Sequence, residues 1–138
     1  MTEGQRQLLA TLRGKRDELV QRSTDIAYAT NDVDLPRADV EQMLRACIAL
    51  LEEGLVGESR AVRDGFLAAL DDVARTTTWE LTMRTGLPCW GIIVGRLAVD
   101  VGEAHRDEAI AYLSRFMGDW WADVSKVMLP VFMAEGKL

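Results

Sequence analysis

The sequence predicts a single all-α domain, a globin-like bundle of about five helices, and three observations support this. The length of 138 residues suits one domain. Hydrophobic residues make up 49% of the chain and charged residues 28%, which is the composition of a globular protein with enough apolar residues to fill a core. Apolar residues recur at helical spacing through most of the chain. Only residues 85–100, TGLPCWGIIVGRLAVD, resemble a strand. A lone strand would have no partner for its backbone groups, so this stretch is also predicted to be helical.

The first predicted helix covers residues 4–29. Leu8, Leu12, Leu19 and Ile26 share one of its faces, and charged residues lie between them. The segment TNDVDLP that follows is rich in turn residues and ends this helix.

Pro36 fits the first turn of the second helix, which ends where EEGLVGES breaks the apolar period. The third helix begins near Ser59. Its period continues through Thr77 and Leu81, so we expect it to cross three consecutive threonines despite their low helix propensity. Gly86 suits the position that ends it.

The fourth predicted helix covers residues 88–101. It is apolar almost all round, which indicates a central, buried helix. Gly91 and Gly95 lie one turn apart, so a neighbouring helix is expected to cross there at short distance.

The last predicted helix covers residues 105–133 and carries two adjacent apolar stripes. One stripe can serve the core of the domain. The other, through Ile110, Met117, Trp121, Met128 and Phe132, predicts a homodimer built on the first and last helices, although helices of the same domain could also cover it. The expected interface residues are Leu8, Leu12, Leu19, Met117, Trp121 and Met128.

Charge and composition exclude several classes of function. The net charge is −6 and the cations are scattered, so neither nucleic acid nor a membrane surface is an expected partner. No apolar run approaches the length of a membrane span, and the N-terminus lacks the apolar region of a signal peptide. With Cys47 and Cys89 as its only cysteines, the chain is expected to be cytoplasmic.

Candidate catalytic and metal-binding residues are few. His105 is the only histidine and stands among charged residues, so we expect it on the surface, with no haem, no metal and no other cofactor. A Ser–His–Asp or Cys–His pairing is not plausible with this histidine, and the chain is not expected to be an enzyme.

Cys89 allows two interpretations. At the second position of the predicted fourth helix, the free N–H groups and the dipole favour a thiolate. Its apolar surroundings favour plain packing instead. Arg96, the only charge in CWGIIVGRLAV, either reaches water or a carboxylate or binds an anion, whereas Arg84 is expected to bond the last carbonyls of its helix.

Aromatic residues suggest an apolar ligand pocket, although residues at helical spacing also pack as simple core. The residues proposed for this pocket are Cys89, Trp90, Arg96, Phe116 and Trp120.

The order of these segments resembles a known family. An amphipathic first helix precedes LPRADVEQML, a long helix ends in WELTMRTGLP, and a buried helix precedes EAIAYLSRFMGDWWADVSKVMLPVF. This resembles the N-terminal sensor domain of RsbR-type stressosome co-antagonist proteins, which has a non-haem, globin-like fold. The resemblance implies dimerisation through the first and last helices and a role in receiving a signal. Members of the family usually carry a second, output domain, which these 138 residues do not include.

The predicted function is therefore a non-catalytic sensor or protein-interaction domain in bacterial signalling, with a regulatory protein partner. The alternative is a thiol-based redox switch or a small enzyme centred on Cys89.

Overall fold

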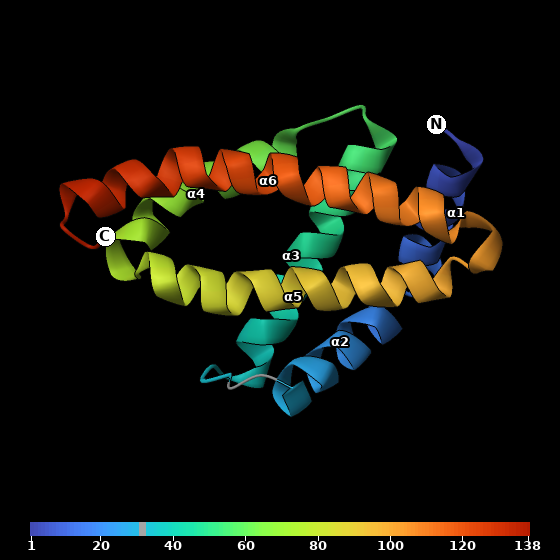
Figure 1. Ribbon diagram of the computed structural model, residues 1–138, viewed down its shortest axis with the longest axis horizontal. Coiled ribbons are helices and arrows are strands. Elements are labelled where there is room, and N and C mark those ends of the chain that lie inside the picture. Colours follow the sequence, from blue (N-terminus) through green and yellow to red (C-terminus); the bar gives the residue numbers. More distant parts are fainter. Residues whose placement is uncertain (31–32) are drawn as a thin grey trace.

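The computed structural model describes residues 1–30 and 33–138, and every regular element in these ranges is helical, which confirms the all-α prediction. The described ranges contain six α-helices rather than about five, together with one short 3₁₀ helix (Figure 1). The elements are α1 (Glu3–Gly14), α2 (Arg16–Thr30), α3 (Arg37–Val56), α4 (Ala61–Thr76), α5 (Trp79–Asp100), η1 (Glu103–His105) and α6 (Arg106–Ala134).

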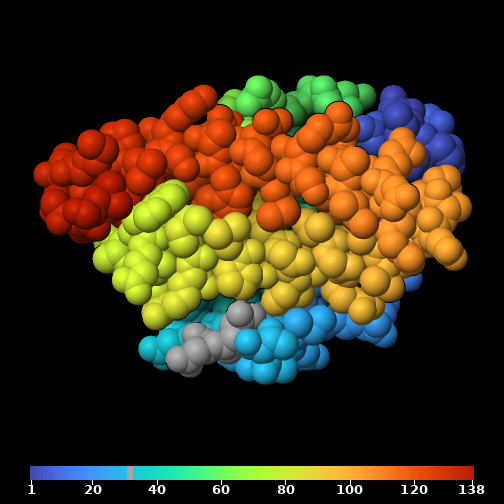
Figure 2. Space-filling model, viewed as in Figure 1, coloured from blue at the N-terminus to red at the C-terminus, as the bar shows by residue number. Residues whose placement is uncertain are grey.

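The long helix α6 organises the bundle. It lies beside α5 along most of its length, packs on α4, and contacts α1 near its start (Figure 1). Helix α3 crosses behind this pair, and α2 packs against α3 and α5. Figure 2 shows the side chains of α5 and α6 meeting on one face of the molecule. None of the helices in the described ranges combines sufficient length with sufficient apolarity to cross a lipid bilayer.

The predicted second helix is confirmed as α3. It begins directly after Pro36, whose fixed φ suits a helix start. It ends at Gly57, which adopts a left-handed φ of 74° that glycine accepts without strain.

The prediction of one helix over residues 4–29 is wrong, because the chain breaks between α1 and α2. Gly14 ends α1, and the N–H of Lys15 closes its last turn on the carbonyl of Thr11 at 3.0 Å. Both halves contact α3 and α5, and the break lets α1 pack on α6 as well. Leu12 is buried on α1, which contacts α6, and Leu19 is buried on α2, which contacts α3 and α5.

The prediction of one helix through the three threonines is also wrong. Helix α4 ends at Thr76, and Thr78 starts α5 by accepting a hydrogen bond from the N–H of Leu81 at 3.1 Å. Threonine is a good N-cap and a poor helix former, which explains the break at this position. Gly86 and Pro88 then lie inside α5 instead of marking a helix boundary.

A lysine at the end of the chain holds the turn between α4 and α5. The ammonium of Lys137 donates to the carbonyls of Ala74 at 3.2 Å, Arg75 at 2.9 Å and Thr77 at 3.1 Å. The last carbonyls of a helix have no partner within it, and a cation beside them also interacts favourably with the negative end of the helix dipole. Lys137 in turn pairs with Glu135 at 2.8 Å.

The predicted dimer interface is contradicted at four of its six positions. The exposed fractions of Leu8 and Leu12 are 0%, and those of Leu19 and Met128 are 2% and 1%, so all four belong to the core of one protomer. The other two, Met117 and Trp121, are partly buried against the same core. Because α6 has α4 and α5 as neighbours, its two apolar stripes are largely covered within the chain.

The prediction that residues 88–101 are helical is confirmed for 88–100, but this segment is buried on one side only. Trp90, Ile93 and Leu97 are buried, whereas Val99 is 55% exposed. Gly91 and Gly95 also face open space, so the expected close helix crossing at these glycines is absent from the described structure.

We predict that Lys137→Met lowers the free energy of unfolding by about 1–3 kcal/mol, because three carbonyls lose a charged donor. Urea denaturation followed by circular dichroism measures the change. Lys126→Met on the exposed surface of α6 is the control and should shift stability by less than about 0.5 kcal/mol. Equal effects of the two substitutions would contradict the role given to Lys137.

Two glycines of α5 should respond to alanine in opposite directions. Gly95→Ala should raise stability by about 0.5–1 kcal/mol, since alanine is the better helix former and its Cβ meets nothing within 4 Å. Gly86→Ala should lower stability by about 1–3 kcal/mol, because its Cβ would lie 2.9 Å from Cη2 of Trp121. The same denaturation measurement applies, and a loss of stability in Gly95→Ala would show that something covers this face.

Candidate ligand cavity

Helices α3, α4, α5 and α6 enclose a cavity of about 620 Å³, which we call the central cavity. Its volume lies within the range of small-molecule sites. Its walls are mostly apolar, and its deepest part is formed by side chains that are almost fully buried. These are Cys47, Leu50, Cys89, Trp90, Trp120 and Met128.

The cavity opens where exposed residues join its lining. Leu35, in the connection between α2 and α3, is 39% exposed, and Val73 on α4 is 45% exposed. Asp34 and Arg84 are also exposed and line the same side. Among the described residues, the central cavity is therefore a pocket with an apolar floor and one charge of each sign at its mouth.

The polar groups of the wall are mostly engaged with their own helix. The hydroxyl of Thr82 donates to the carbonyl of Thr78 at 2.9 Å, and that of Thr85 donates to the carbonyl of Leu81 at 2.8 Å. A hydroxyl has one proton, so these threonines offer a ligand only acceptor lone pairs. Arg84 differs, because its side chain forms no ion pair or hydrogen bond with any described residue.

Trp120 connects the wall of the cavity to the surface. Its ring packs edge-on against Phe66, with centroids 5.3 Å apart, and the guanidinium of Arg63 lies 5.4 Å from its centroid. Nε of Arg63 donates to Oδ2 of Asp123 at 3.0 Å, and this hydrogen bond is the main cause that lowers the pKa of Asp123. A displacement of the Trp120 ring would therefore press on an ion pair that water reaches.

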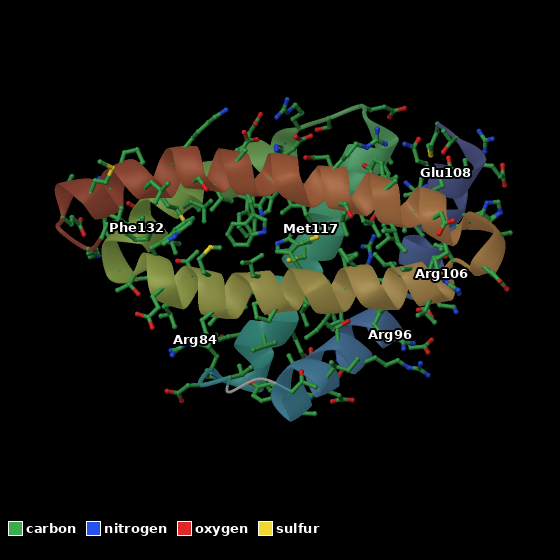
Figure 3. The ribbon with its side chains drawn as sticks, in the orientation of Figure 1. Arg84, Arg96, Arg106, Glu108, Met117 and Phe132 are labelled. Atoms are coloured by element: carbon green, nitrogen blue, oxygen red, sulfur yellow. The ribbon has the colours of Figure 1, made fainter. Side chains whose placement is uncertain are left out.

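Three of the five residues proposed for a pocket lie on the central cavity, namely Cys89, Trp90 and Trp120. Arg96 does not. It lies about 18 Å along α5 from Arg84, given a rise of 1.5 Å per residue, and pairs with Asp100 at 3.5 Å (Figure 3).

Phe116 also lies outside the central cavity. It is one turn before Trp120 on α6, with its ring 5.9 Å from that of Trp90 and packed closely against Gly54 of α3. It lines a separate hollow of about 550 Å³ with Arg60, Arg63 and Arg115. Arg60 and Arg115 form no ion pair with a described residue, but the acidic Glu53 and Asp119 share this hollow and would repel an anion, and Arg63 is already paired.

The sequence did not reveal the contributions of α3 and α4 to the cavity, because Met43, Leu50 and Phe66 follow the same apolar period as any core residue. From its place just before Gly86, the sequence predicts that Arg84 bonds the last carbonyls of its helix. Since α5 continues to Asp100, Arg84 does not lie in the last turn of its helix, and that interpretation is wrong.

The thiols are poor nucleophiles in this structure. Cys89 is the eleventh residue of α5, not the second residue of a helix, so the helix dipole does not favour its thiolate. Burial raises the pKa of Cys89 and, more strongly, that of Cys47. His105 lies in η1, away from the central cavity, and the described residues contain no His, Cys, Asp and Glu cluster suited to a metal ion.

Comparison with protein-family models, curated proteins and solved structures finds no match.

We predict that both cysteines react with 5,5′-dithiobis(2-nitrobenzoate) at pH 7.5 at least about 100-fold more slowly in the folded protein than in urea. Cys47→Ala assigns the remaining rate to Cys89. Because burial raises the folded-state pKa values, the unfolded thiols ionise first as the pH rises through about 8.5, and stability should fall above that pH. Fast labelling of folded Cys89 would instead support a thiol switch.

Proposed function

We propose that this chain is a non-catalytic sensor domain that binds a small apolar molecule in the central cavity. The observation that carries the proposal is the cavity itself, about 620 Å³ of space walled by apolar side chains from four helices. Protein interiors are normally close-packed, with few voids larger than a water molecule. A pocket of this size with an apolar floor and a polar mouth is typical of a ligand site.

An unpaired donor on the same wall supports this proposal. Trp121 contributes to the lining, and its indole Nε1 is buried without an acceptor among the described residues. Buried donors are normally hydrogen-bonded, so this N–H is a candidate contact for a polar atom of the ligand.

A sensor also needs a route from its ligand to its surface, and Trp120 supplies one. The ring lies on the cavity wall on one side and against Arg63 on the other. A ligand that shifts the ring would change the position of the Arg63–Asp123 pair on α4 and α6. A partner that contacts these helices would then meet a different surface in the bound state.

The remaining parts of the proposal concern context. A regulatory domain of the RsbR type, with a globin-like fold, a protein partner and a cytoplasmic location, is consistent with an all-α bundle around a cavity. A homodimer also belongs to this proposal, but its interface would have to differ from the predicted one, because Leu8, Leu12, Leu19 and Met128 are buried.

The alternative function, a redox switch or small enzyme centred on Cys89, has weaker support. The thiol is buried 11 residues into α5, and its raised pKa keeps it protonated at neutral pH. Its place on the cavity wall makes it a contact for a ligand instead.

A neutral fluorescent probe tests the cavity. We predict that 6-propionyl-2-dimethylaminonaphthalene binds with a blue-shifted emission, and that Thr85→Trp weakens this binding at least about tenfold by filling the mouth. The substitution removes only a hydroxyl bonded within its own helix. Native mass spectrometry of the freshly purified protein should also reveal a bound small molecule.

The matched control is Thr11→Trp on α1. Thr11 is also partly buried, and its hydroxyl likewise donates to the carbonyl four residues earlier, that of Gln7, at 2.9 Å, but it lies outside the cavity. Binding should be unchanged in this variant. Equal loss in both variants, or no binding to the wild-type protein, would overturn the proposed function.

A further inference from the structure

We infer that the ligand of the central cavity is a monoanionic amphiphile, a carboxylic acid with an apolar body, whose carboxylate pairs with Arg84 at the mouth. This inference rests on the proposed function and adds the chemical class of the ligand.

The first argument is the missing counterion of Arg84. The chain has 22 acidic and 16 basic residues, so an exposed arginine readily meets a carboxylate. Arg37, Arg45 and Arg75 all do so. Arg84, Arg60 and Arg115 form no ion pair with any described residue, and of these three only Arg84 lies on the wall of the central cavity. Its five N–H donors are available to a ligand in the fork geometry that fits a carboxylate.

The second argument is the position of Arg84 between two spaces. A smaller pocket of about 80 Å³ adjoins the central cavity and shares Leu35, Met43, Arg84, Thr85 and Cys89 with it. Figure 3 shows Arg84 extending from α5 on the side that faces α2 and α3. A head group bound there would leave the apolar body of the ligand beside the buried tryptophans.

The third argument concerns the number of charges. Arg84 is the one cation among the described residues that line the central cavity. Thr82 and Thr85 already use their hydroxyl protons within α5, so they add no donor for a second anionic oxygen group. The unpaired indole N–H of Trp121 on this wall is neutral, so a phosphate or a dicarboxylate would lack a second cation, whereas a single carboxylate is matched by a single guanidinium.

Asp34 opposes this charge and gives the inference a second variant. It lies at the same mouth but forms no ion pair with Arg84. Its carboxylate would repel an anionic head group, so removing its charge should strengthen the binding of an acid without affecting a neutral ligand.

Three probes with the same ten-carbon chain test the inference at pH 7.5: decanoate, decan-1-ol and decyltrimethylammonium. Isothermal titration calorimetry should give decanoate an affinity about fivefold to tenfold higher than decan-1-ol, with decyltrimethylammonium weakest. Arg84→Gln should remove the preference for decanoate and leave decan-1-ol unchanged. Asp34→Asn should increase the preference.

Arg22→Gln is the matched control. Arg22 is an exposed helical arginine on α2, paired with Glu18 at 3.1 Å and absent from the cavity wall, so its loss should leave the preference intact. Equal affinity of the wild-type protein for decanoate and decan-1-ol, or an unchanged ratio in Arg84→Gln, would overturn the inference. If decanoate fails to bind a protein that takes up the neutral naphthalene probe, the inference is wrong and the proposed function stands.

Discussion

The reversal of the chain between α4 and α5 is the constraint on which the bundle and its cavity depend. Both helices pack along α6, and they can do so only because the chain turns back after Thr76. Three carbonyls at this turn accept hydrogen bonds from Lys137, which follows the end of α6. The last residues of the chain therefore fix a turn some 60 positions earlier. Without the turn, α4 and α5 would continue as one rod, and the four walls of the cavity could not meet.

Periodicity was enough to predict the fold class, because each helix has to bury an apolar face. It failed at the two breaks for a common reason. Leu12 and Leu19, and likewise Val73 and Leu81, keep the helical period across the interruption, so the pattern looks continuous. Two of the helix boundaries have local signals, Gly14 at the end of α1 and the cap at Thr78 at the start of α5. The end of α4 is also held by the ammonium of Lys137, which is some 60 residues away in the sequence.

The candidate site was predictable only in part, for reasons of helix phase. Trp90 and Trp120 are large aromatics on helices that face each other, and such residues meet in most arrangements of a small bundle. Phe116 and Arg96 are chemically suited to a pocket wall, but they lie outside the cavity. Phe116 is one turn before Trp120 on α6, and Arg96 is six residues after Trp90 on α5. Arg84 was misjudged because its assignment depended on a helix end at Gly86. Because α5 continues past Gly86, Arg84 has no helix end to bond, and its guanidinium is left without a partner among the described residues.

The mouth and the floor of the cavity differ in how firmly they are held. The part of the floor that lies on α6 belongs to a helix packed on both sides, and Trp120 contacts Phe66 and Arg63 there. At the mouth, Pro88 has no N–H to donate to the carbonyl of Arg84, so the turn that carries this arginine lacks a helical hydrogen bond. Helices bend at such positions. Under the proposed function, the wall would adapt at Arg84, where the head group binds, and the aromatic floor would pass the change to the Arg63–Asp123 pair. This division of rigidity suits a sensor better than a catalyst, which needs its reacting groups held in one fixed geometry.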